Sequence, residues 1–130
     1  MFANLSNAPV AQINSKDSIV IRDNFQSIRG GTTLGVVGFT PDVIQAGHVV
    51  IRETSTGDYK PMPIASASTY AALPALHTYA GVVVASIRTS KPFAGIMVRG
   101  TINPVAAPYD FATIAVAFRT ALPLIDQRAD

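Results

Sequence analysis

The sequence predicts a single β-rich α+β domain, a small barrel or sandwich with one short C-terminal helix and an extended N-terminal arm. Short runs of branched apolar residues are separated by glycine and proline, a pattern typical of strands and turns. Helical spacing of apolar residues occurs in one stretch, near the C-terminus. The length of 130 residues fits one domain.

The predicted arm covers residues 1–17, and the domain covers residues 18–130. The arm contains Asn, Ser, Gln, Ala and Pro without sustained periodicity. Its few apolar side chains do not offset the cost of ordering the backbone, about 1–2 kcal/mol per residue. We therefore expect contact with a partner to order the arm. The candidate residues for that contact are four of its apolar side chains: Phe2, Leu5, Val10 and Ile13.

Three strands are predicted in the first half of the domain. The first covers residues 18–22, which are rich in branched side chains. The second covers residues 47–53, and residues 59–64 return after a short polar turn. Pro61 and Pro63 cannot donate to a strand ladder, so the returning segment is expected at a sheet edge or as irregular chain.

The clearest strand covers residues 79–87 and is almost continuously apolar, which predicts that both of its faces are covered. Residues 89–92 form a predicted turn, and residues 93–100 return. Gly95 within the return is expected to mark a bulge or a close backbone approach. Residues 66–78, which precede this pair, are predicted to form a surface loop.

The helix is predicted over residues 111–122, after the N-cap residue Asp110 and before Pro123. Its apolar residues recur at three- and four-residue spacing, so they share one inward face. A last short strand is predicted at residues 124–125. The candidate core and trimer residues come from this helix and from the apolar strand: Val82, Val84, Phe111, Ile114 and Phe118.

The composition limits the classes of partner. Charged residues make up 14% of the chain, against about 25% in an average soluble protein, while hydrophobic residues make up 48%. This shortage of charge predicts that part of the surface is buried against other subunits. The basic residues are scattered singly, so no nucleic acid partner is expected. The longest apolar stretch, residues 81–87, is too short to span a bilayer, and no membrane partner is expected.

The sequence offers no catalytic or cofactor-binding pattern. Cysteine is absent, which excludes disulfides and cysteine-ligated zinc. His48 and His77 match no metal-binding spacing. A triad of Ser66, His77 and Asp58 can be assembled only by free choice, because no Gly-x-Ser-x-Gly motif supports it. We therefore expect no enzyme, no cofactor and no metal.

Three arginines, Arg88, Arg99 and Arg119, lie inside or beside apolar runs. One interpretation is that they recognise carboxylates across a subunit contact. The other is that their stems cover apolar surface at strand and helix ends while the charged heads reach water. The sequence leaves both open.

The order of these segments resembles the head decoration proteins of tailed phages, of the phage lambda type. The resemblance covers residues 43–126. Its motifs are GHVVIR at 47–52 with TGDYKP at 56–61, AGVVVA at 80–85, RGTI at 99–102, and the helix at 110–121. The first forty residues match less well.

The resemblance implies a non-enzymatic structural virion protein with a β-tulip fold. Such proteins form homotrimers at the local three-fold positions of an icosahedral shell and clamp neighbouring subunits of the major capsid protein, which also orders the arm. The implied location is the outer surface of the capsid, after assembly in the host cytoplasm.

Two other classes stay open at this point. A small β-barrel module that binds a peptide or sugar, or the base of a head or tail fibre, is the alternative. A small hydrolase is the third. A ligand module predicts a monomer with a concave apolar pocket, and a hydrolase predicts polar side chains that converge in such a pocket. Shell binding predicts a trimer without turnover.

Overall fold

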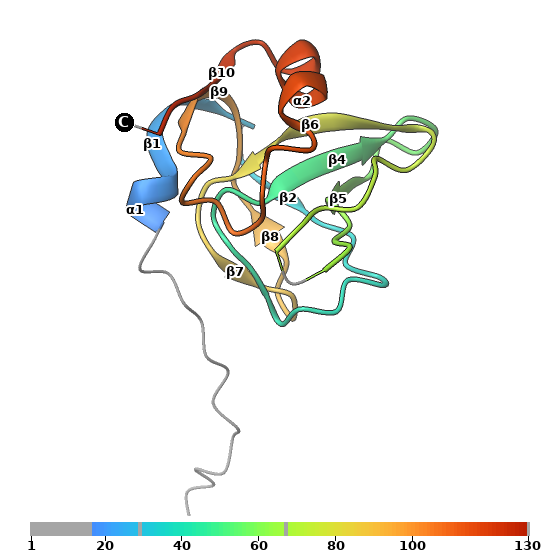
Figure 1. Cartoon of the computed structure of the whole chain (residues 1–130). Helices are drawn as coiled ribbons and strands as arrows, with labels where there is room; N and C mark the ends of the chain where they lie inside the picture. The colour runs from blue at the N-terminus through green and yellow to red at the C-terminus, as the bar shows by residue number, and fades with distance from the viewer. Residues whose placement is uncertain (1–16, 29, 67, 130) are drawn as a thin grey trace, which may run out of the picture.

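The computed structural model describes residues 17–28, 30–66 and 68–129 (Figure 1). Two helices and ten strands occur in this described part. In chain order they are α1 (Asp17–Val20), β1 (Ile21–Ser27), β2 (Thr32–Thr33), β3 (Val43–Ile44), β4 (Val49–Glu53), β5 (Tyr59–Pro61), β6 (His77–Val83), β7 (Ile87–Arg88), β8 (Phe93–Ala94), β9 (Ile96–Ile102), α2 (Ala115–Ala121) and β10 (Ile125–Gln127).

The main sheet has the strand order β1-β9-β6-β4-β5, and β10 also pairs with β9. All pairs are antiparallel except β10 with β9. Two small antiparallel sheets, β2–β8 and β3–β7, complete the described strands. The fold is therefore β-rich with one short C-terminal helix, as the sequence predicts. The main sheet stays open between β1 and β5 in the described chain, so the closed-barrel option is wrong and a sandwich-like arrangement remains.

Two hydrophobic clusters lie on either side of the main sheet. Val82 belongs to one cluster and its neighbour Val83 to the other, because successive side chains of a strand point to opposite faces. Both residues are fully buried. This confirms that the apolar strand is covered on both faces. Helix α2 covers the first cluster, where Phe118 packs edge-on against Tyr79 at 5.6 Å between ring centroids (Figure 1).

The predicted hairpin is present as β4 and β5. Val50 pairs with Pro61 and Arg52 with Tyr59, and Gly57 takes a positive φ of 79° in the turn between the strands. Strand β5 is the last in the sheet order, so Pro61 lies at an edge, and Pro63 follows in irregular chain, as their missing N–H groups require. The prediction for this segment is confirmed.

The first predicted strand is wrong at its start. Asp17–Val20 forms one helical turn, and the strand runs from Ile21 to Ser27 instead. The carboxylate of Asp17 accepts hydrogen bonds from the backbone N and the hydroxyl of Ser86, at 2.9 and 2.7 Å. These long-range contacts hold residue 17 in the domain, and local β propensity could not reveal them.

The clearest predicted strand also has different bounds. Strand β6 begins two residues earlier, at His77, and ends at Val83. Residues 87–88 pair with β3 in a separate small sheet, and the return is divided between β8 and β9. Gly95 is not a point of close approach, since a Cβ there would lie 3.8 Å from Val84. The close approach is at Gly81, where a Cβ would overlap the carbonyl oxygen of Met97.

The C-terminal helix is shorter than predicted. It covers Ala115–Ala121, and its N-cap is Ile114 rather than Asp110. Asp110 Oδ1 instead accepts a hydrogen bond from the backbone N of Ala112 at 2.8 Å, which closes a local turn before the helix. The last strand likewise begins at Ile125 and not at residue 124.

Candidate interaction surface

The predicted core and trimer residues lie within one cluster of a single chain. Phe111, Ile114 and Phe118 are at most 6% exposed, and the rings of Phe111 and Phe118 meet edge-on at 5.4 Å. Val82 is fully buried among them, and Val84 is half-buried against the same cluster. All three side chains predicted for the helix are buried, but Phe118 alone lies within α2, while Phe111 and Ile114 precede the helix. A contact with another copy at this helix would therefore use its outer face, where Val116 is 77% exposed.

The four candidate arm residues, Phe2, Leu5, Val10 and Ile13, lie outside the described residues. What the structure describes is the point at which the arm joins the domain. There Asp17 is bonded to Ser86, and the carbonyl of Val20 accepts a hydrogen bond from the backbone N of Asn103 at 2.8 Å. The arm therefore starts from a fixed position beside the loop that follows β9.

Large apolar side chains are exposed along the whole domain. They come from helices, strand β1, the small strand β8 and several loops: Ile19, Phe25, Val37, Leu76, Phe93, Val105, Val116 and Leu124. Each is at least half exposed, and Val37 is fully exposed. Single exposed apolar residues are ordinary, so these eight described side chains are candidate contact residues rather than a continuous patch.

Strand β1 is exposed at six of its seven positions. It ends the sheet order and pairs only with β9 among the described strands. Phe25 on this strand is 66% exposed, and the guanidinium of Arg99 lies 4.3 Å from its ring centre. The charged head of Arg99 therefore forms a cation–π contact with an exposed aromatic ring, and this contact does not decide between the two interpretations of the arginine. Apart from this contact and the half-buried Ile21, β1 is open to solvent in the described part of the chain.

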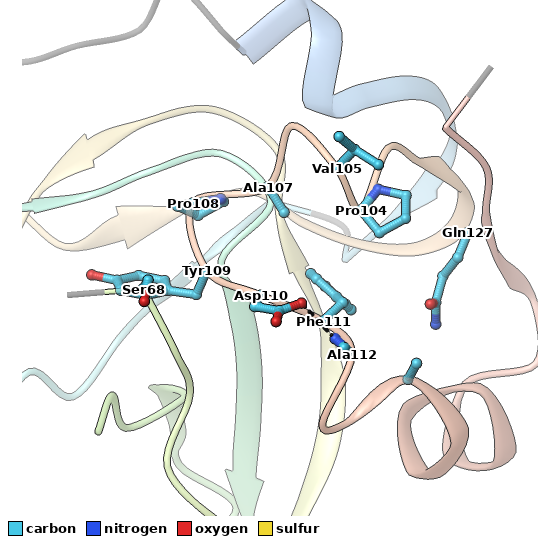
Figure 2. A pocket seen from close by; sticks show the side chains of 11 residues that line it. Ser68, Pro104, Val105, Ala107, Pro108, Tyr109, Asp110, Phe111, Ala112 and Gln127 are labelled. Atoms are coloured by element: carbon cyan, nitrogen blue, oxygen red, sulfur yellow. Dashed lines mark hydrogen bonds between the residues drawn. The ribbon is translucent and has the colours of Figure 1, made fainter. Parts of the chain in front are cut away.

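A groove of about 540 Å³ lies between the loop after β9, the segment before α2, and β10 (Figure 2). Its walls are mostly apolar, and its ionisable groups are Asp110 and Tyr109. Burial raises the pKa of Tyr109, so its hydroxyl stays neutral. The groove therefore carries one negative charge and no positive one. Its main lining residues are Pro104, Val105, Tyr109, Asp110, Phe111 and Gln127.

Gln127 projects into this groove from β10 (Figure 2). Its Nε2 atom is buried and has no hydrogen-bond partner, and it is the one such side-chain atom in the part of the chain that the structure describes. Leaving a buried donor unpaired costs about 1–3 kcal/mol. Nothing in the sequence separates Gln127 from the chain's other polar residues. The groove could not be predicted from the sequence either, since its walls combine residues 104–115 with Ser68 and Gln127, which are distant in sequence.

His48 is the centre of an aromatic cluster inside the domain. The rings of Phe39, Tyr70 and Tyr109 each meet it edge-on at 5.3 Å. Burial lowers the pKa of His48 from 6.5 to about 4, an effect that the hydrogen bond from its Nε2 to the carbonyl of Met62 partly opposes. His48 is therefore a neutral core residue. Tyr70 is also buried, and its hydroxyl accepts a hydrogen bond from the backbone N of Val49 at 3.0 Å.

Ser66 and His77, two members of the triad that the sequence allows only by free choice, have separate hydrogen-bond partners. The hydroxyl of Ser66 bonds to that of Thr69, and His77 Nδ1 donates to the carbonyl of Ala75. No group of three His, Cys, Asp or Glu side chains that could hold a metal ion occurs within residues 17–28, 30–66 and 68–129. In the same ranges, no helix has the length and apolar character needed to cross a membrane.

Comparison of the chain with protein-family models, with curated proteins and with solved structures finds no match. The site is therefore interpreted from its own geometry, in which the exposed apolar side chains and the groove are the features suited to binding.

Proposed function

We propose that the chain is a structural virion protein that decorates an icosahedral phage capsid and stabilises it by binding the major capsid protein as a homotrimer. The observation that carries the proposal is the apolar surface of a domain with few charges. Within the described residues, eight large apolar side chains are at least half exposed, while charged residues make up 14% of the chain. Such a surface is stabilised when it is buried against another protein.

The fold we propose is the β-tulip of the lambda-type head decoration proteins, which the order of sequence motifs resembles. An open antiparallel sheet, two accessory sheets and one short C-terminal helix support this assignment. The edge position of β5 and the hairpin it forms with β4 correspond to the motifs that carry the resemblance.

The stabilising effect would come from repeated small contacts. Burial of one Val, Leu or Phe side chain contributes about 1.5–3 kcal/mol. A trimer presents each such contact three times, and its second and third contacts form at the high local concentration set by the first. A trimer over a three-fold position would therefore hold neighbouring capsid subunits together although each single contact is weak. In this proposal the arm adds its own apolar side chains to the shell contact.

Two measurements test the proposal. Light scattering of the purified chain should give three times 13.7 kDa, about 41 kDa. Saturating protein should raise the temperature at which empty shells of the same phage come apart. The double variant F2A/L5A should reduce that rise, whereas Ser90→Ala in an exposed turn should leave it unchanged. A stable monomer that leaves the shell's disruption temperature unchanged would contradict the proposal.

A further inference from the structure

We propose that the groove beside α2 binds the arm of a neighbouring copy, residues 10–16, so that each protomer of the trimer receives one arm and gives one. This inference rests on the homotrimer of the proposed function. It assigns Val10 and Ile13 to the neighbouring copy and leaves Phe2 and Leu5 for the capsid protein.

The groove itself has the chemistry of a site for an extended apolar peptide. Its volume of about 540 Å³ lies within the range of ligand pockets. Its walls include Pro104, Val105 and Phe111. The Nε2 of Gln127 is an unpaired donor, for which a peptide carbonyl is a suitable acceptor. An extended peptide offers one carbonyl per residue together with apolar side chains. A sugar would bring a hydroxyl on most carbons, for which Ser68, Asp110 and Gln127 offer too few partners.

The negative charge at the groove favours the arm as the segment that binds there. Asp110 is exposed at the groove, and no basic side chain lines it. Residues 1–16 contain no Asp or Glu, and Lys16 is their one charged side chain. The arm is therefore complementary to the groove in the sign of its charge, and Val10 and Ile13 supply apolar side chains for the apolar walls.

The position of the arm's first fixed residue points to a neighbouring copy. Helix α1 lies across the loop after β9 from the groove, beyond Val105 in Figure 2. Val20 of α1 and Pro108, which lines the groove, both lie against Gly47, so the arm begins close to the groove wall of its own chain, on the far side of this loop in Figure 2. An arm that docks on another copy, rather than passing around this loop, forms a heterologous contact. Such a contact closes into a ring after three copies when the rotation is 120°.

The length of the arm allows the exchange. Val10 lies seven residues before Asp17, a distance of up to about 24 Å in extended chain. Sixteen residues extend to about 55 Å, so the segment before Val10 can still reach beyond the groove to the shell.

Engineered disulfides test this in the full-length chain, which has no native cysteine. The pair Ala11→Cys and Ala112→Cys places one thiol between the two apolar arm residues and one on the groove wall. The control pair is Ala11→Cys with Ser55→Cys, in the exposed turn after β4. At about 10 μM chain, we expect the groove pair to form interchain disulfides about 100-fold faster than the control pair, because a bound arm holds its thiol at millimolar local concentration.

Covalent dimers and trimers on a non-reducing gel support the proposal. An intrachain disulfide would assign the groove to the arm of its own chain. Absence of a product above the control rate would leave the groove to a segment of another protein. Either result overturns the proposal.

Charge and the unpaired donor provide a second readout. Lys16→Glu in the groove pair should slow disulfide formation about two- to five-fold, the range expected for one exposed ion pair, and Lys16→Arg should not. Gln127→Leu should also slow it, because the carbonyl of the arm loses its donor. Equal rates in all variants would contradict the proposed docking. The assay contains no shell, so its failure is distinct from a failure of the decoration function.

Discussion

Acidification from pH 7.5 to pH 5.0 should lower the free energy of unfolding by about 2 kcal/mol, because His48 is buried as a neutral ring. Burial lowers its pKa from 6.5 to about 4 in the folded chain. Between these values the unfolded chain binds a proton that the folded chain does not. Stability is therefore complete above pH 6.5 and is lost as the pH falls toward 4. The difference between a pKa of 6.5 in the unfolded chain and about 4 in the folded chain corresponds to a total loss of about 3 kcal/mol in the free energy of unfolding.

Urea denaturation at the two pH values measures this loss. Glu53 contributes in the same direction, because hydrogen bonds from Lys60 and Thr56 lower the pKa of this exposed carboxyl in the folded chain, and a matched control is needed to remove its contribution. The matched control is His48→Gln, whose side-chain amide can still donate to the carbonyl of Met62 but does not titrate. If His48→Gln loses as much stability as the unmodified chain, or if neither loses any, the assignment of the pH dependence to His48 is refuted.

The remaining predictions concern packing and use the same denaturation measurement. Phe118→Ala should cost about 3–5 kcal/mol because the ring is fully buried, whereas Val116→Ala on the exposed face should change stability by less than about 0.5 kcal/mol; equal effects would refute the orientation of α2. Gly81→Ala should cost about 1–3 kcal/mol because its Cβ would overlap the carbonyl of Met97, and Gly95→Ala should be nearly neutral because its Cβ has room; the reverse order would contradict the register of β6 against β9. Asp17→Ala should cost about 1 kcal/mol through the loss of its two hydrogen bonds to Ser86, and an unchanged unfolding curve would show that the arm is not fixed there.

The sequence predicted two kinds of element: those whose backbone is constrained by turn residues and proline, and those whose apolar residues follow a regular spacing. The hairpin of β4 and β5 was predicted because proline and turn residues constrain the backbone directly. The inward face of α2 was predicted from spacing, although the helix begins four residues later than expected. The burial of both faces of β6 followed from its continuous apolar run.

Long-range contacts decided what the sequence could not predict. The helical turn at Asp17 depends on Ser86, 69 residues away. The run predicted as one strand is divided because Ile87 and Arg88, after a bend at residues 84–86, pair with β3, a strand of two residues that no periodicity signals. The burial of His48 depends on rings from three other segments. The groove with Gln127 likewise forms only when β10 lies beside β9.

Co-sedimentation of the full-length chain with empty shells, assembled from the major capsid protein of the same phage, tests the central claim most directly. The account predicts saturable binding with three chains at each occupied site, and weaker binding for F2A/L5A than for Ser90→Ala. A chain that stays in the supernatant at every concentration, while the shells sediment intact, would contradict the account.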